Sequence, residues 1–113
     1  MNSLKNSVKL IGHLGADPEI RRLEGGKIVA NFSLATSDSY KNARGEKVTN
    51  TQWHRIVAWG KTAEIAEKYA KKGTEVAVHG KLEYRNYEDK EGITRYVTEI
   101  RISEILLLSK AAA

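Results

Sequence analysis

The sequence predicts a mainly β domain, a small five-stranded barrel with one α-helix between the third and fourth strands. Five segments alternate apolar and polar residues as half-buried strands do, and only one segment has helical spacing. The chain has 113 residues, the size of one domain with a modest core. We assign residues 1–108 to that domain. An open α+β sheet remains an alternative, because the order of elements does not show that the sheet closes.

The first strand is predicted at residues 8–14 from its apolar alternation. Gly12 and Gly15 indicate a bulge or a sharp bend, which small barrels use to turn a corner. An Asp-Pro pair at 17–18 marks a turn, and a Gly-Gly pair at 25–26 is a hairpin signal.

The four remaining strands form two predicted hairpins with polar tips. The first tip is too long for a tight turn, so we expect a flexible basic arm there. The second arm has turn residues and three acidic residues at its end, which we do not expect to contact a polyanion. The predicted strands are residues 28–36, 51–60, 75–82 and 95–108, and the arms are residues 37–50 and 83–93.

The helix is predicted at residues 62–72, between the third and fourth strands. Thr62 is its expected N-cap, and Gly73 ends it. Ile65 and Tyr69 have i, i+4 spacing, so we expect them to face the core. Three strands, one helix and two strands is the element order of the OB-fold barrel.

The third strand carries the residues with the clearest functional pattern. Because side chains alternate along a strand, both tryptophans of the protein, Trp53 and Trp59, project to the same face as Arg55. Bases of a single nucleic-acid strand stack on such rings whatever their sequence, and arginine adds a phosphate contact. Packing of the tryptophans against the helix or a partner subunit is the alternative.

The two arms support nucleic-acid binding, because each joins a tyrosine to basic residues. Tyr40 precedes Lys41 and Arg44, and Arg85 precedes Tyr87. The net charge of +5 also favours a polyanionic partner, although a basic soluble protein need not bind one. Tyr96 is interpreted as a cross-strand packing residue. Arg21, Arg22, Lys81 and Arg101 could also line a groove, but single cations are usually solvated.

Several functional classes find no support in the sequence. The chain has no cysteine, which excludes disulfides and thiolate chemistry. It has no phosphate-binding glycine loop, and its histidines, at 13, 54 and 79, lack paired metal-ligand spacing. We therefore expect no enzyme, no cofactor and no metal. No apolar run approaches the length of a membrane helix, so we expect no membrane partner and a cytoplasmic location with the nucleoid.

Motifs along nearly the whole chain resemble the bacterial single-stranded DNA-binding protein family. They are Gly-His-Leu-Gly-Ala-Asp-Pro-Glu at 12–19, Ala-Asn-Phe-Ser-Leu-Ala-Thr at 30–36, Trp-His-Arg at 53–55, Gly-Lys at 60–61, Lys-Gly at 72–73 and Gly-Lys-Leu at 80–82. The resemblance implies an OB-fold, a homotetramer that wraps single-stranded DNA, and a role in DNA replication, recombination and repair.

The resemblance also implies roles for individual residues. Stacking falls to Tyr40, Trp53, Trp59 and Tyr87; the family typically has tryptophan at the first and last of these positions, so stacking there should be weaker. His54 corresponds to a histidine at a subunit interface. Together with the basic pattern, we predict DNA contacts from Lys41, Arg44, Arg55, Lys61, Lys72, Arg85 and Arg95.

The resemblance differs at the C-terminus, where the family continues into a tail with an acidic tip. We interpret residues 109–113 as the remnant of a truncated tail or as a cloning scar, with a natural short form as the alternative. We expect replication and repair proteins as partners only if such a tail exists. Two rivals remain: a dimeric OB-fold accessory protein of replication restart, and an OB-fold module whose aromatic face binds a protein.

Overall fold

The structure, a computed structural model, describes residues 5–109. The C-terminal remnant expected at 109–113 therefore lies outside the described residues, apart from Ser109. The strand predicted at 8–14 is confirmed to the residue. The strands predicted at 28–36, 51–60 and 75–82 are confirmed with longer spans, and the one predicted at 95–108 is confirmed with its bounds shifted by one residue. The elements are β1 (Val8–Leu14), β2 (Glu19–Arg22), the 3-10 turn η1 (Glu24–Gly26), β3 (Ile28–Lys41), β4 (Lys47–Trp59), α1 (Gly60–Tyr69), β5 (Glu75–Glu88) and β6 (Thr94–Leu107).

The sheet closes into a barrel, as the OB-fold prediction requires. The strand order is β1-β5-β6-β4-β3, and β3 pairs again with β1. Every pair is antiparallel except β4 with β6. Gly12 lies where β1 meets β3, and a Cβ there would come within 2.2 Å of the carbonyl oxygen of Ala35. The glycine predicted to serve a bend thus permits the close approach that closes the barrel.

β2 is a sixth strand that the sequence analysis did not predict. It pairs with β3 outside the ring of five, from Glu19 opposite Asn31 to Arg22 opposite Ile28. Its four residues include a single apolar side chain, Ile20, so they show no alternation. The strand forms because the turn at η1 folds it back onto the β3 backbone.

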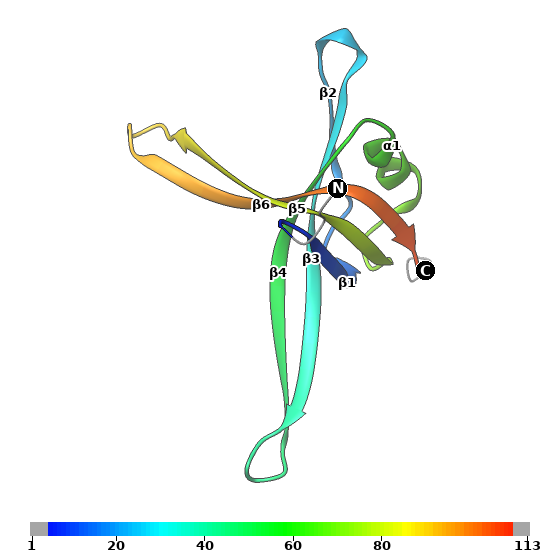
Figure 1. Ribbon diagram of the computed structural model, residues 1–113, viewed down its shortest axis with the longest axis vertical. Coiled ribbons are helices and arrows are strands. Elements are labelled where there is room, and N and C mark those ends of the chain that lie inside the picture. The colour runs from blue at the N-terminus through cyan, green and yellow to red at the C-terminus, as the bar shows by residue number, and fades with distance from the viewer. Residues whose placement is uncertain (1–4, 110–113) are drawn as a thin grey trace.

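Three hairpins project from the barrel: β2–β3, β3–β4 and β5–β6 (Figure 1). The first arm, predicted as a basic hairpin arm, is a hairpin in which β3 and β4 stay paired as far as Lys41 opposite Lys47. Hydroxyl pairs across the ribbon, Ser37 with Thr51 and Ser39 with Thr49, add to the backbone ladder. The β5–β6 arm is paired similarly to its end, and a turn at Asp89–Gly92 closes it.

Asp89 organises that turn. Its carboxylate accepts hydrogen bonds from the backbone N–H groups of Glu91 and Ile93 and from Nε of Arg95. The bond from Arg95, and next the bond from Ile93, hold the pKa of Asp89 below its ordinary value. A lowered pKa in the folded state stabilises the turn above the ordinary pKa, and that stabilisation is lost as the pH falls through the folded-state pKa.

We therefore expect the amide signals of Glu91 and Ile93 to keep their neutral-pH positions through the ordinary range of an aspartate, about pH 3.9, and to shift only below it. An NMR pH titration measures this directly. In the variant Asp89→Asn the acid transition should disappear from both amides. A transition at the ordinary aspartate pKa in the wild type would contradict the proposed role of Arg95.

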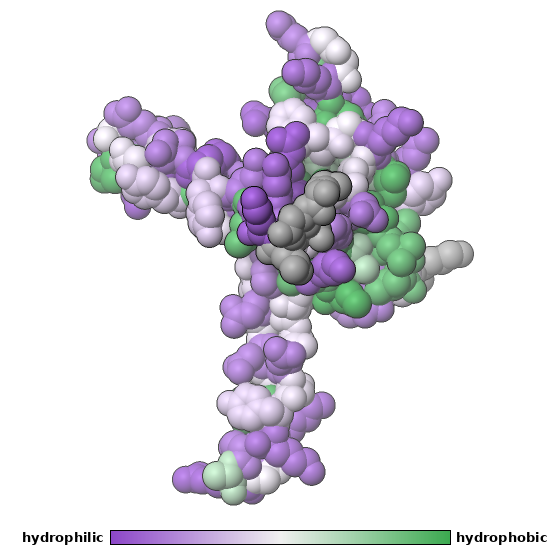
Figure 2. Space-filling view, viewed as in Figure 1, coloured by the Kyte–Doolittle hydropathy of each residue, from purple (hydrophilic) through white to green (hydrophobic). Residues whose placement is uncertain are grey.

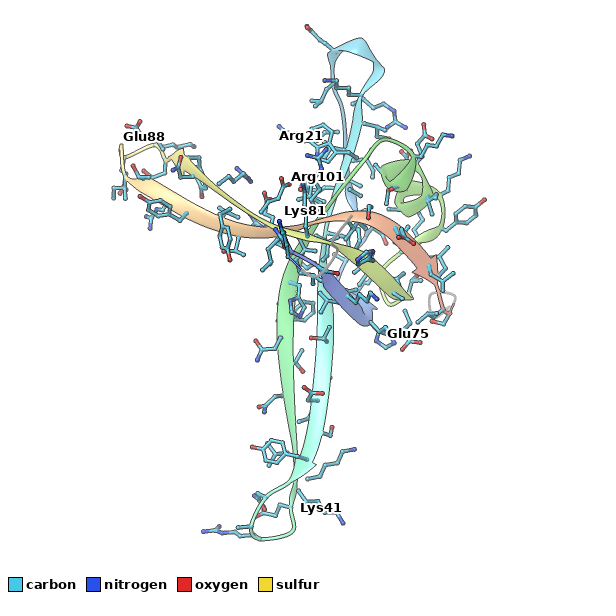
Figure 3. All side chains as sticks on the ribbon, viewed as in Figure 1. Arg21, Lys41, Glu75, Lys81, Glu88 and Arg101 are labelled. Atoms are coloured by element: carbon cyan, nitrogen blue, oxygen red, sulfur yellow. The ribbon has the colours of Figure 1, made fainter. Side chains whose placement is uncertain are left out.

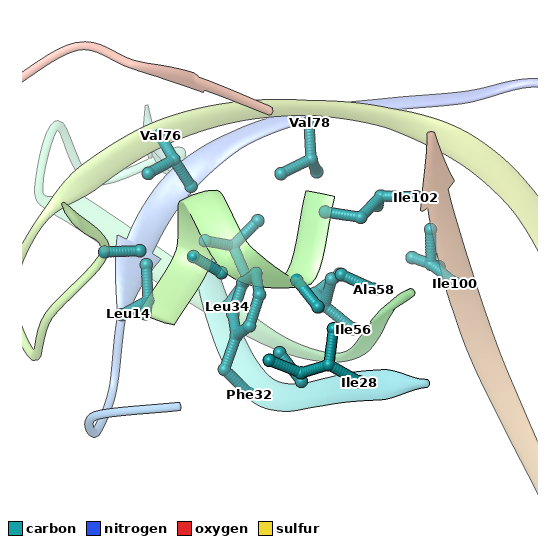
Figure 4. Close-up of a cluster of buried hydrophobic side chains, with 14 residues drawn as sticks. Leu14, Ile28, Phe32, Leu34, Ile56, Ala58, Val76, Val78, Ile100 and Ile102 are labelled. Atoms are coloured by element: carbon teal, nitrogen blue, oxygen red, sulfur yellow. The ribbon is translucent and has the colours of Figure 1, made fainter. Parts of the chain in front are cut away.

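Inward-facing side chains from all five barrel strands fill the core (Figure 4). Alternation along β3 and β4 places their inward residues there. Leu34 and Ile56 are completely buried, and truncating such residues typically costs about 2–5 kcal/mol. The labelled core residues are Leu14, Ile28, Phe32, Leu34, Ile56, Ala58, Val76, Val78, Ile100 and Ile102.

The helix α1 packs on β3, β4 and β6 with a face other than the one predicted. Ala63, Ala66 and Ala70 are buried, whereas Ile65 is exposed and Tyr69 is 60% exposed, so the core role predicted for these two is wrong. The small alanine side chains let the helix approach the barrel closely. A prediction based on large apolar residues does not detect a buried face made of alanines.

The predicted ends of the helix are also corrected. The helix begins at Gly60, with Trp59 at the N-cap and no side-chain cap. Thr62, the predicted cap, lies inside the first turn and donates to the carbonyl of Ser103. The helix ends at Tyr69, and Gly73 follows in the loop with a φ of 86°.

Candidate nucleic-acid interface

The outer face of β4 presents the pattern expected from the sequence. Trp53 is 62% exposed and Trp59 is 37% exposed, whereas Ile56 and Ala58 on the other face are buried in the core. Arg55 lies between the two tryptophans on their face, opposite Ser33 of β3. The alternative that the tryptophans are buried against the helix does not hold, because both side chains are exposed in this chain. Two flat apolar surfaces with a cation between them suit the stacking of successive bases.

Gly15 supports the ring of Trp53. A Cβ on Gly15 would come within 2.6 Å of Cζ3 and 2.9 Å of Cη2 at the far edge of the indole. Gly15 also donates its N–H to the carbonyl of Ser33, which fixes the loop after β1 against β3. The absence of a side chain at this position therefore leaves room for the six-membered ring of the indole beside the loop.

Replacing Gly15 with alanine should displace the Trp53 ring and leave the barrel folded, since only the movable end of the indole meets the new methyl group. We expect a shifted tryptophan emission maximum. We also expect the free energy of oligo(dT) binding to weaken by about 1 kcal/mol, the lower end of the range for one stacking contact. Titration of the fluorescence measures both. An unchanged affinity with a displaced ring would show that Trp53 does not stack on DNA.

Trp59 carries a second cation. The guanidinium of Arg101 lies over its ring, 5.6 Å from the centroid, a distance typical of a cation–π contact. Nη1 of Arg101 is 3.9 Å from a carboxylate oxygen of Glu83, a loose ion pair between half-exposed side chains. The sequence indicated Arg101 only as a cation that could line a groove. Its flanking by Ile100 and Ile102 indicates an outward side chain, but only the strand register places it beside Trp59.

The first arm carries Tyr40 and Lys41 at the end of β3 and Arg44 in the turn that follows. Figure 3 shows Lys41 far along the ribbon from the barrel. Tyr40 pairs with Val48, and by alternation it lies on the opposite ribbon face from Trp53. All three predicted contacts are exposed, but the structure does not bring them together with the tryptophans. A nucleic-acid strand that contacts both Tyr40 and the two tryptophans would have to run along the arm and around its edge.

The second arm places Tyr87 between two arginines, since Arg95 lies opposite it and Arg85 precedes it by two residues. Arg85 lies 5.9 Å from the ring centroid of Tyr87. Both arginines are paired with carboxylates: Nε of Arg85 is 2.7 Å from Glu99, and Nε of Arg95 is 2.9 Å from Asp89. The hydrogen bond to Glu99 raises the pKa of Arg85 above its ordinary value.

Tyr96 lies on the other face of this arm and is 79% exposed, so its predicted packing role is wrong. It stands opposite Asn86. The arm is a two-stranded ribbon with no second layer against it, and for that reason a cross-strand neighbour alone does not bury a tyrosine.

Lys61 and Lys72 flank the face at opposite ends. Lys61 lies in the first turn of α1, two residues after Trp59. Lys72 lies in the loop after α1, and its backbone N–H donates to Asp17, two residues beyond the glycine that supports Trp53. Both are exposed.

His54 lies on the opposite side of β4 from the tryptophans, as its parity predicts. It is half-buried, and its Nε2 forms a 2.8 Å hydrogen bond with the hydroxyl of Thr36. Its role at a subunit interface stays a prediction.

Basic residues gather where the second arm leaves the barrel. Figure 3 shows Arg21, Lys81 and Arg101 at this junction. Lys81 is the register partner of Arg101, and Arg21 lies opposite Val29, which in turn lies opposite Trp59. Arg21 lies on β2, and because that strand was not predicted, the position of Arg21 beside this face was not predicted either. Across residues 5–109, no three metal-binding side chains are placed to hold an ion, and no helix combines the length and apolarity that crossing a bilayer requires.

The sequence that forms this barrel and its aromatic, basic face matches a known protein family. The model of the single-strand binding protein family matches residues 5–108. The chain belongs to this family. The match spans the barrel, both long arms and every residue of the face described above. Family membership therefore agrees with the OB-fold that the structure shows.

Individual members of the family are similar over most of the chain. Single-stranded DNA-binding protein 1 of Chlorobaculum tepidum is 48% identical over 104 residues, covering 91% of this chain and 64% of that protein. Its namesake in Xylella fastidiosa is 45% identical over 106 residues, covering 93% and 78%. The chain thus spans less than two thirds of the first relative's length.

Two solved structures share the fold. The Plasmodium falciparum SSB in complex with ssDNA superposes with a TM-score of 0.83 at 34% identity, covering 92% of this chain and 95% of that one. A deletion mutant of the single-stranded DNA binding protein from Thermus aquaticus gives a TM-score of 0.78 at 31% identity, covering 92% and 50%.

Proposed function

We propose that this chain binds and protects single-stranded DNA without sequence preference, in replication, recombination and repair. Bases stack on Trp53 and Trp59, and lysines and arginines contact the phosphates. The observation that carries the proposal is the exposed Trp53–Arg55–Trp59 row on one face of β4. The complex of the Plasmodium falciparum relative with ssDNA supports it. The mode is binding and not catalysis, and its place of action is the cytoplasm with the nucleoid.

A competition experiment tests this function. Labelled oligo(dT) should be displaced equally well by unlabelled single strands of mixed sequence and poorly by duplex DNA, because duplex bases are not free to stack on the protein. The affinity should also fall steeply with added salt, since cations released from phosphates drive binding. Equal displacement by duplex DNA, or no binding at low salt, would overturn the proposal.

We further propose that the functional unit is a homotetramer. An apolar row crosses the outer face of β1, β5 and β6: Ile11 lies opposite Ala77, which lies opposite Leu106. Ile11 and Leu106 are each about 60% exposed. Figure 2 shows hydrophobic residues gathered over the ends of these strands, whereas the long arms are mainly hydrophilic. A second copy would remove this patch from water.

Native mass spectrometry tests the assembly. A mass of four chains is expected, and a mass of two chains would favour the dimeric replication-restart type of protein. We do not propose that residues 5–109 recruit replication and repair proteins, because the family resemblance assigns that role to an acidic C-terminal tail.

A further inference from the structure

A polar groove lies between β2, β3, β4 and the base of the second arm. Its volume is about 510 Å³. Three arginines line it, Arg21, Arg55 and Arg85, and two carboxylates, Glu19 and Glu99, lie among them. The groove adjoins the tryptophan face, because Arg55 belongs to both. A DNA backbone that leaves the tryptophans toward the second arm would enter this groove.

Glu99 is the most enclosed charge in the groove. It is 8% exposed, and its carboxylate accepts two hydrogen bonds from Arg85, from Nε at 2.7 Å and from Nη2 at 3.3 Å. Arg85 is half-exposed. Arg21 and Arg55 differ from Arg85, since none of the ion pairs within residues 5–109 involves either of them.

The pairing decides which arginines can exchange partners with DNA. Taking Arg85 away from Glu99 would leave an uncompensated carboxylate with little access to water, which is strongly unfavourable. A phosphate contact at the half-exposed side of Arg85 would contribute only the small stabilisation of an exposed ion pair, which is less than the cost of leaving the Glu99 carboxylate unpaired. Arg85 therefore stays with Glu99, which also keeps the guanidinium beside the ring of Tyr87.

We propose that Glu99 is a tuning residue that keeps Arg85 neutralised, so that phosphates in this groove bind only Arg21 and Arg55. The inference rests on the proposed binding of single-stranded DNA and refines it. The sequence predicted Arg85 as a DNA contact and gave Arg21 only as a residue that could line a groove, so the proposal changes the role of both. The Glu99 carboxylate thereby limits the affinity and the salt dependence of binding.

The salt dependence of oligo(dT) binding tests the inference, because each phosphate contact on a single strand changes the slope of log K against log salt by about 0.7. The variant Glu99→Gln frees Arg85, and its slope should steepen by about that amount. The double variant Arg85→Gln/Glu99→Gln removes a neutral pair and should keep the wild-type slope. If the single variant does not fold, the double variant decides alone.

A matched control is available in Glu67→Gln. Arg22 and Glu67 form a similar two-bond pair at 2.9 Å outside the groove, so this variant makes the same charge change elsewhere and should leave the slope unchanged. An unchanged slope for Glu99→Gln, or a double variant whose slope falls by about 0.7, would overturn the inference while wild-type binding stands. Failure of the wild type to bind would overturn the proposed function and this inference with it.

Discussion

Replacing Trp53 with alanine is expected to weaken oligo(dT) binding by about 1–3 kcal/mol, the measured range for one base–aromatic stacking contact. The loss corresponds to a factor between about 5 and 150 in Kd. The indole is open to solvent and supported by Gly15, so its removal takes away a base platform without creating a cavity in the core. A fluorescence-anisotropy titration with labelled oligo(dT) measures the change.

Tyr69 provides the matched control for this prediction. It is 60% exposed, close to the 62% of Trp53, but lies on α1 away from the face. Tyr69→Ala should leave the affinity at the wild-type value, and both variants should keep the wild-type midpoint in thermal unfolding. Equal losses from the two variants would contradict a specific stacking role for Trp53.

Replacing Gly80 with alanine is expected to destabilise the barrel by about 3 kcal/mol or more, the upper part of the range for overpacking. A Cβ at this position would come within 2.1 Å of the carbonyl oxygen of Arg101 and 2.6 Å of the Cα of Ile102. Both are backbone atoms, so no side-chain rotation relieves the clash. Gly80 lies at the irregularity where β5 and β6 shift register, and relief there would require the two strands to separate.

Urea unfolding at a fixed protein concentration measures this loss, with Gly45→Ala as the comparison. Gly45 has a φ of 79° and nothing within 4 Å of a built Cβ, so its substitution strains only the backbone, at about 1–2 kcal/mol. An aggregated or unfolded Gly80→Ala protein agrees with the prediction. A free energy of unfolding within about 1 kcal/mol of the wild type would contradict the close approach of the strands, since it lies at the bottom of the overpacking range.

Alternation made the central part of the site predictable. Because Ile56 and Ala58 are small or apolar and lie between Trp53 and Trp59, the two faces of β4 follow from the order of residues alone. The same argument applies to Ile28, Phe32 and Leu34 of β3, which share one parity and lie in the core. These predictions need only the period of a strand, which does not depend on what the strand pairs with.

Features that depend on register were beyond the sequence. The stacking of Arg101 on Trp59 joins β6 to β4, and the pair of Arg85 with Glu99 joins β5 to β6. No local pattern specifies how far one strand slides along another, and the bulge after His79 shifts the register further. The buried face of the helix was predicted wrongly for another reason. That face is made of alanines, which contribute little to a hydrophobic pattern.

Intrinsic fluorescence tests the central claim most directly, because both tryptophans of the protein lie on the proposed DNA face. Their emission therefore reports on that face alone. Titration with oligo(dT) at low salt should quench the emission until the sites are filled, and added salt should restore it as the DNA dissociates. Emission that stays unchanged at saturating oligo(dT) and low salt would contradict the account.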